Sequence, residues 1–149
     1  MPSGRLLLAA ALAAGALLAA PESALAATRV SGGGAADISQ VAMSVAITDS
    51  GAASGSFQCL MAGRSAFALA PFGLDHVMAV HATPTSGSVS GSVVTFSGPG
   101  RLILDGRQKI DVTVVVWVDV ATQTFQLTVV GVATLPVESL LTGRISLRT

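Results

Sequence analysis

The sequence predicts an all-β protein, either a single antiparallel β-sandwich or a small closed barrel of about eight strands. Apolar and polar residues alternate with a period of two over most of residues 41–148, which places successive side chains on opposite faces of a strand. Clusters of Gly, Pro, Asp and Ser interrupt this alternation roughly every 8–12 residues, the spacing typical of sandwiches and barrels. Beyond the N-terminal segment, no stretch shows three turns of helical periodicity.

Residues 1–26 have the pattern of a secretory signal peptide. Arg5 supplies the positive charge, residues 6–20 form an unbroken run of Leu, Ala and Gly, and Pro21 ends that run. Ala-Leu-Ala at residues 24–26 is a small-x-small cleavage motif. A transmembrane anchor is the alternative, but the apolar run is shorter than the roughly 20 residues that span a bilayer. We therefore expect a secreted or periplasmic protein.

The chain after the signal peptide has the length of one domain. Residues 27–36 contain Ser-Gly-Gly-Gly and predict a flexible Gly-rich lead-in, because glycine-rich segments behave as flexible coils. Residues 37–149 form the predicted all-β domain. Its strands are expected at residues 41–48, 54–62, 77–83, 88–96, 101–104, 108–120, 124–130 and 144–148.

The connections between these strands differ in how strongly the sequence specifies them. Asp105-Gly106 predicts a hairpin with a type I′ turn, whose two central residues need positive φ. Residues 97–100, Ser-Gly-Pro-Gly, predict another turn. Residues 64–73 are interpreted as a loop, and residues 136–141 as a short helical turn.

The strand at residues 108–120 is the most regular element. One face carries an aliphatic row that must pack in a core: Ile110, Val112, Val114, Val116, Val118 and Val120. An outer-membrane barrel is the rival architecture, with aromatic girdles at both interfaces. The aromatic side chains here do not bracket each strand, so a barrel of that kind is not expected.

Composition excludes several partners. The chain has 8 basic and 8 acidic residues and a net charge of zero, so no overall field attracts nucleic acid or an anionic membrane. No membrane span is expected after removal of the signal peptide, and a protein or cell-surface partner remains open. Cys59 is the only cysteine, which rules out an intramolecular disulfide and leaves either burial or pairing between chains. Its apolar strand neighbours favour burial.

Only Asp75, His76 and His81 form a weak metal-site candidate, since two histidines and a carboxylate are common ligands. Residues five apart in a strand point to opposite faces, however, which favours two ordinary histidines. We therefore predict no catalytic residue, no cofactor and no metal. The most favoured function is a non-catalytic exported β-domain, a binding or structural module at the cell exterior.

Two other functions stay open. A barrel carrying a small apolar ligand would need a cavity lined by the face from Val112 to Val118. A hydrolase would need a loop-borne site around residues 64–81, and the chain lacks the G-x-S-x-G motif of one hydrolase class.

Three segments, at residues 56–63 (SFQCLMAG), 91–98 (GSVVTFSG) and 135–145 (LPVESLLTGRI), carry a resemblance. Together they resemble a group of small, signal-bearing bacterial all-β proteins without a known function. The resemblance implies an exported all-β domain. It implies no activity, and no functional residue is transferred from it.

Overall fold

The computed structural model describes residues 27–61 and 77–149, and all of its regular structure is β. The strands are β1 (Ala27–Ala35), β2 (Gln40–Thr48), β3 (Ala53–Met61), β4 (Met78–Ala82), β5 (Ser86–Ser90), β6 (Val93–Leu104), β7 (Gln108–Asp119), β8 (Thr124–Val129), β9 (Ala133–Thr134), β10 (Glu138–Ser139) and β11 (Arg144–Arg148). They form one antiparallel sheet in the order β10-β8-β7-β6-β4-β3-β2-β1-β11, with β5 on β6 and β9 on β8.

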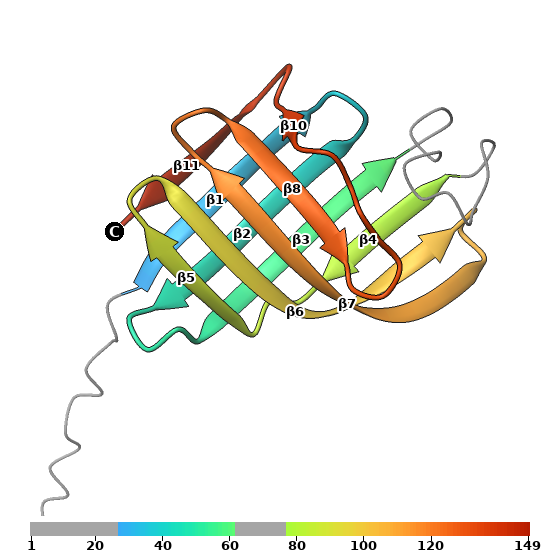
Figure 1. The fold of residues 1–149 in the computed structure, drawn as a ribbon, viewed down its shortest axis with the longest axis horizontal. Coiled ribbons are helices and arrows are strands. Elements are labelled where there is room, and N and C mark those ends of the chain that lie inside the picture. Colours follow the sequence, from blue (N-terminus) through green and yellow to red (C-terminus); the bar gives the residue numbers. More distant parts are fainter. Residues whose placement is uncertain (1–26, 62–76) are drawn as a thin grey trace, which may run out of the picture.

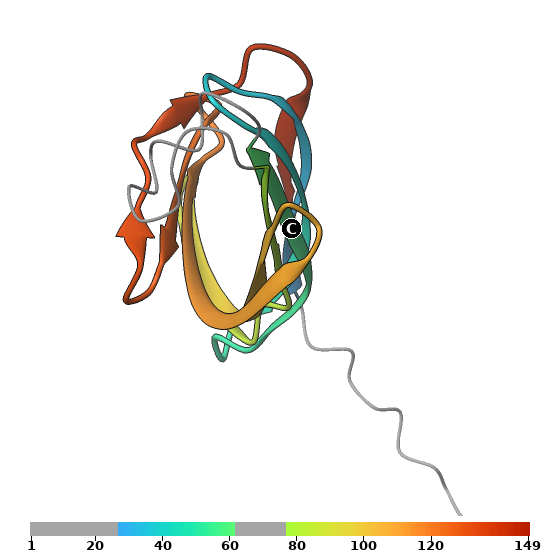
Figure 2. The ribbon, with the colours of Figure 1, turned by 90° about the vertical axis from the view of Figure 1, so that its right-hand side faces the viewer.

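The sheet curls over itself into an open half-barrel (Figures 1 and 2). Strands β5 to β8 form one layer, and β1 to β4 with β11 form the other, whose strands cross those of the first (Figure 1). The all-β antiparallel prediction is therefore confirmed. The sheet has 11 strands rather than about eight, because β1, β9 and β10 were not predicted and two other predictions are wrong. The strand predicted at residues 88–96 is a hairpin that turns at residues 91–92, so it holds the end of β5 and the start of β6. The strand predicted at residues 101–104 is the end of β6.

The hydrophobic core lies on the concave face of the curled sheet. The predicted inner face of β7 is confirmed, since Val114, Val116 and Val118 are fully buried. Ile110 and Val112 are only half-buried, because that end of β7 extends beyond the centre of the core. The rings of Phe57 and Phe96 meet edge to face with their centroids 5.8 Å apart, and so join the two layers.

The Gly-rich segment predicted to be a flexible lead-in is instead strand β1. It pairs with β2 on one side and with β11 on the other. Gly32 and Gly34 have φ of +135° and +158°, and a Cβ at these positions would meet the backbone carbonyl oxygens of Arg144 and Thr142. Glycine is thus needed here for close packing of neighbouring backbones, which the prediction of flexibility overlooked.

The predicted turn at residues 97–100 is also wrong, because β6 runs through it without a break. The first part of β6 pairs with β5 and the last part with β4, so the strand passes between the two layers. A Cβ on Gly98 would meet the carbonyl oxygen of Thr83, and the Thr83 N–H donates to the Pro99 carbonyl at 2.9 Å. Glycine therefore permits the bend that carries β6 from one layer to the other.

Two other local predictions have opposite outcomes. Asp105 and Gly106 both have positive φ, 51° and 66°, and the Arg107 N–H donates to the Leu104 carbonyl, which confirms the type I′ turn. The predicted helical turn at residues 136–141 is wrong: this segment holds β10, which pairs with β8. Its pairing partner is distant in the chain, so local sequence did not indicate it.

The two outer edges of the sheet are tied to the rest of the fold by polar contacts. The side-chain amide of Gln123, in the β7–β8 turn, donates to the Ile145 carbonyl at 2.9 Å and accepts from the Ile145 N–H at 2.8 Å. Beside β10, Ala36 and Leu140 form an isolated bridge. These contacts hold β11 and β10 in place at the open side of the curl.

Among the described residues, no helix is long and apolar enough to cross a membrane. Cys59 is buried as a free thiol, which confirms the expectation of burial and the absence of a disulfide within the chain.

Candidate functional site

A row of polar side chains crosses the outer, convex face of the sheet. Strand register places Gln58 of β3 opposite His81 of β4, His81 opposite Arg101 of β6, and Arg101 opposite Asp111 of β7. All four side chains are exposed, because they alternate along their strands with residues that face the core. The register thus gathers into one line four residues that lie far apart in the sequence.

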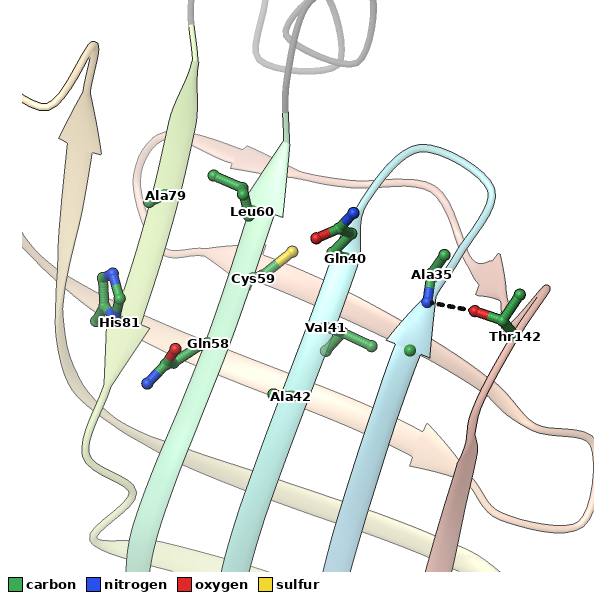
Figure 3. A pocket seen from close by; sticks show the side chains of 11 residues that line it. Ala35, Gln40, Val41, Ala42, Gln58, Cys59, Leu60, Ala79, His81 and Thr142 are labelled. Carbon is green, nitrogen blue, oxygen red and sulfur yellow. Dashed lines mark hydrogen bonds between the residues drawn. The ribbon is translucent and has the colours of Figure 1, made fainter.

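The row is flanked by a hollow of about 540 Å³ over β1 to β4. Apolar side chains of different sizes make its floor, with Ala42 and Ala79 on either side of β3 and the exposed Leu60 between Gln40 and Ala79 (Figure 3). Gln40, Gln58 and His81 stand around it. The hollow therefore offers amide and imidazole groups beside an apolar surface of Ala42, Ala79 and Leu60, and none of its lining residues is acidic.

A second hollow, of about 750 Å³, lies on the other side of His81 over β3, β4, β6 and β7. His81 and Gln58 line both hollows, so they form the ridge between them. Arg101 and Asp111 border the second hollow and form an ion pair, with Nε 3.2 Å from Oδ1. This pair is well exposed, and exposed pairs contribute little to stability.

The polar groups on the ridge are available to a ligand. In the described part of the chain, the side chains of Gln58 and His81 make no hydrogen bond. An amide carries two N–H donors and one acceptor oxygen, and a neutral imidazole carries one donor and one acceptor. Neighbouring unpaired donors and acceptors beside a hollow suit a ligand with hydroxyl or amide groups.

The structure separates the residues that the sequence analysis singled out. Asp75 and His76, and most of the 64–81 region, lie outside the described residues. His81 points outward, whereas Cys59 points into the core one residue from the position that pairs with His81. Cys59 and His81 therefore do not form a nucleophile pair, and no group of three metal-ligating side chains occurs in residues 27–61 and 77–149.

A buried polar cluster lies inside the fold where the β1–β2 turn meets β10. Glu138 is 1% exposed, and its Oε2 accepts from the Ser39 Oγ at 2.8 Å and from the Ile38 N–H at 3.1 Å. In return, the Asp37 carboxylate accepts from the Ser139 N–H at 2.7 Å. These contacts fasten the β1–β2 turn to β10.

Burial controls the ionisation of this cluster. It raises the pKa of Glu138, and the negative charge of Asp37 raises it further, against the hydrogen bonds from Ser39 and Ile38. Burial also raises the pKa of Cys59 to about 12, with Glu138 adding to the rise and Ser39 opposing it. A thiol with that pKa is a poor nucleophile near neutral pH, so the cluster is suited to holding the fold rather than to catalysis.

Sequence reasoning found His81 but missed Gln58, Arg101 and Glu138. Gln58 and Arg101 become site residues only through strand register, which the local pattern does not reveal. Glu138 did have a local indication, since it stands between apolar residues in Leu-Pro-Val-Glu-Ser-Leu-Leu. An acidic residue in such a setting is a candidate for burial with a partner.

Comparison with known proteins does not identify this site. No family model matches the chain, and no match was found among curated proteins or solved structures.

Proposed function

We propose that this protein is an exported, non-catalytic β-domain that binds a neutral, hydroxyl-rich ligand on its outer face. The ligand is a segment of a neutral cell-surface polysaccharide, and it binds in the hollow beside Gln58 and His81. The observation that carries the proposal is the ridge itself: two unpaired polar side chains, opposite each other in register, stand between two hollows.

The composition of the hollow supports a neutral ligand. Gln40, Gln58 and His81 offer hydrogen-bond donors and acceptors. Ala42, Leu60 and Ala79 give apolar surface against which the C–H groups of a sugar ring can pack. The packing inside the fold favours a ligand site on the outer face, because Val114 and Val116 of the inner face are buried among core side chains. A site between the layers would have to displace that packing.

Export is supported by the signal-peptide pattern of residues 1–26. Cleavage after residue 26 would keep all of the described strands, β1 to β11, in the mature domain. The domain would then act in the periplasm or outside the cell.

We also infer that the sheet behaves as a small closed barrel rather than as a sandwich. The hydrogen bonds between Gln123 and Ile145 and the bridge between Ala36 and Leu140 support this inference, because they tie the open edges. A closed, rigid sheet would keep Gln58 and His81 in fixed positions for binding.

Binding of neutral oligosaccharides tests the function directly. Isothermal titration of the purified protein with cello-, malto- and chito-oligosaccharides should find at least one ligand that binds, and the ligand should be recovered uncleaved. Gln58→Ala should weaken that binding about tenfold through loss of hydrogen bonds in the site. Gln108→Ala, at the exposed start of β7, is the matched control and should change nothing. Cleavage of the ligand, or equal effects of the two variants, contradicts the proposal.

A further inference from the structure

Three arginines lie on the outer face of β1 and β11. Arg29 and Arg148 lie away from the hollow, whereas Arg144 borders it, because Arg144 pairs with Gly33 and Gly33 pairs in turn with Ala42 of the hollow. Arg29 of β1 stands directly opposite Arg148 of β11, and Arg144 lies four residues before Arg148 on the same strand. All three are exposed. Arg29 precedes the fully buried Val30, and Arg144 precedes the fully buried Ile145, so these side chains point away from the core.

The neighbouring strands carry no acidic residue that balances this charge. The adjacent strands β3, β2, β1 and β11 contain no Asp or Glu at any position. In the described residues, Arg29, Arg144 and Arg148 make no salt bridge and no side-chain hydrogen bond. The zero net charge of the chain thus hides a local excess of three positive charges.

The Arg29–Arg148 pair has an energetic cost. Like charges directly opposite each other on neighbouring strands destabilise a sheet. Charges that protect a sheet edge from aggregation would belong on the edge strand, which is β11. Arg29 is on β1, between β2 and β11, so protection of the edge does not explain it.

Two opposed guanidinium groups are well suited to an oxyanion. Each presents a planar fork of N–H donors that binds sulfate, phosphate or carboxylate through two hydrogen bonds. Arg144 and Arg148 are about 13 Å apart along the strand, four residues at about 3.3 Å each. The arrangement therefore offers two anion contacts to one extended chain.

The residues around the arginines indicate which kind of anionic polymer binds there. Hydroxyl groups lie next to the arginines on the same two strands, from Ser31 of β1 and Ser146 of β11, which are opposite each other. Ser44 of β2 and Ser56 of β3 continue this row away from the arginines. The outer face of these strands carries no aromatic side chain on which a nucleic-acid base could stack. No large apolar side chain accompanies the arginines on β1 or β11 to enter a membrane.

We propose that the outer face of β1 and β11 is a second binding site, which takes an acidic polysaccharide through Arg29, Arg148 and Arg144. The anion contact at Arg29 and Arg148 does not depend on the hollow beside His81, and Arg144 lies between the two sites. Its affinity is electrostatic and falls with added salt, because exposed charges are screened over about 8–10 Å at physiological ionic strength.

Binding to immobilised dextran sulfate tests the proposal, with neutral dextran as the reference surface. The purified protein should bind dextran sulfate at low salt and be released as the salt concentration rises. The double variant Arg29→Gln/Arg148→Gln should bind about tenfold more weakly. Arg107→Gln removes the same kind of charge from the β6–β7 turn and should bind like the wild type. Gln58→Ala should also bind like the wild type, which separates this site from the hollow.

Each of the other outcomes overturns the proposal. Equal weakening by Arg107→Gln would mean that binding follows net charge alone. Equal or tighter binding to single-stranded DNA or to phosphatidylglycerol vesicles would assign the arginines to a different partner.

Circular dichroism melting checks the double variant, which should be as stable as the wild type because a like-charged pair has been removed. If the double variant does not fold, Arg148→Gln alone must show weaker binding to dextran sulfate.

Discussion

The side chain of Gln123 bonds to both peptide groups of Ile145, donating to its carbonyl at 2.9 Å and accepting from its N–H at 2.8 Å. A side-chain amide thus takes the place that a neighbouring strand would have at the free edge of β11. The same amide donates to the Val120 carbonyl at 2.6 Å, so its donors are fully used. This contact joins the β7–β8 turn to the last strand of the sheet.

Gln123→Ala should loosen the edge of the sheet. It leaves the Ile145 N–H and carbonyl without their partner, and the expected loss is about 1–3 kcal/mol in the free energy of unfolding. Urea denaturation measures the loss, and amide hydrogen exchange should show faster exchange at Ile145. Gln108→Ala removes an exposed glutamine of the same size and should leave both measurements unchanged. Undiminished protection of the Ile145 amide in Gln123→Ala would show that the contact does not hold β11.

Val116→Asp should unfold the protein. Val116 is fully buried on the inner face of β7, and an unpaired charge there costs several kcal/mol. That cost is comparable to the whole stability of a domain, about 5–15 kcal/mol. Val115→Asp places the same charge on the outer face and should be tolerated. A cooperative thermal transition for Val116→Asp, with wild-type circular dichroism, would contradict the assignment of the faces.

Glu138 should make stability depend on pH. Its pKa is raised above the ordinary value of 4.5, so the folded protein binds more protons than the unfolded chain at pH values just above 4.5. The free energy of unfolding should therefore fall as the pH rises from 4.5 through the native pKa of Glu138. Asp37 and Cys59 are the other titratable groups that face Glu138. Asp119 titrates in a lower pH range, because a hydrogen bond from the Ser92 hydroxyl lowers its pKa below 3.8.

The Glu138→Gln variant isolates this effect. Its amide oxygen can still accept from Ser39 and Ile38, but it has no charge to lose. Urea denaturation at a series of pH values above 4.5 should show a smaller slope in the variant than in the wild type. Identical slopes would mean that Glu138 is not the group responsible.

Cys59 should be unreactive in the folded protein. Its pKa of about 12 leaves only about one thiolate in ten thousand at pH 8, and the sulfur is buried. A disulfide-exchange reagent that absorbs on reaction should label Cys59 only after urea is added. Rapid labelling of the native protein, or a disulfide-linked dimer on a non-reducing gel, would contradict the burial of the thiol.

Local sequence patterns predicted the parts of the fold that depend on local geometry. The alternation in β7 identified its buried face, and Asp105-Gly106 identified the turn, because a type I′ turn needs residues that accept positive φ. The failures involve contacts between distant segments. Gly32 and Gly34 resemble a flexible linker in the sequence, but the backbone of residues 142–145 lies against them. Gly98 resembles a turn residue, but the backbone of Thr83 and Pro84 lies against it.

The candidate site was less predictable than the fold for the same reason. His81 stands out in the sequence because the chain has only 2 histidines. Its neighbours Gln58 and Arg101 are identified by the pairing of β3, β4 and β6, and the sequence did not specify that pairing. The opposition of Arg29 and Arg148 also depends on register, between strands at the two ends of the domain.

Chemical-shift mapping tests the central claim most directly, which is that the ligand binds on the outer face beside Gln58 and His81. The purified, ¹⁵N-labelled protein would be titrated with the oligosaccharide that binds best. The account predicts shifts centred on Ala42, Gln58, Ala79 and His81, with little change at Val114 and Val116. Shifts centred on Val114 and Val116 would place the ligand inside the fold and contradict the account.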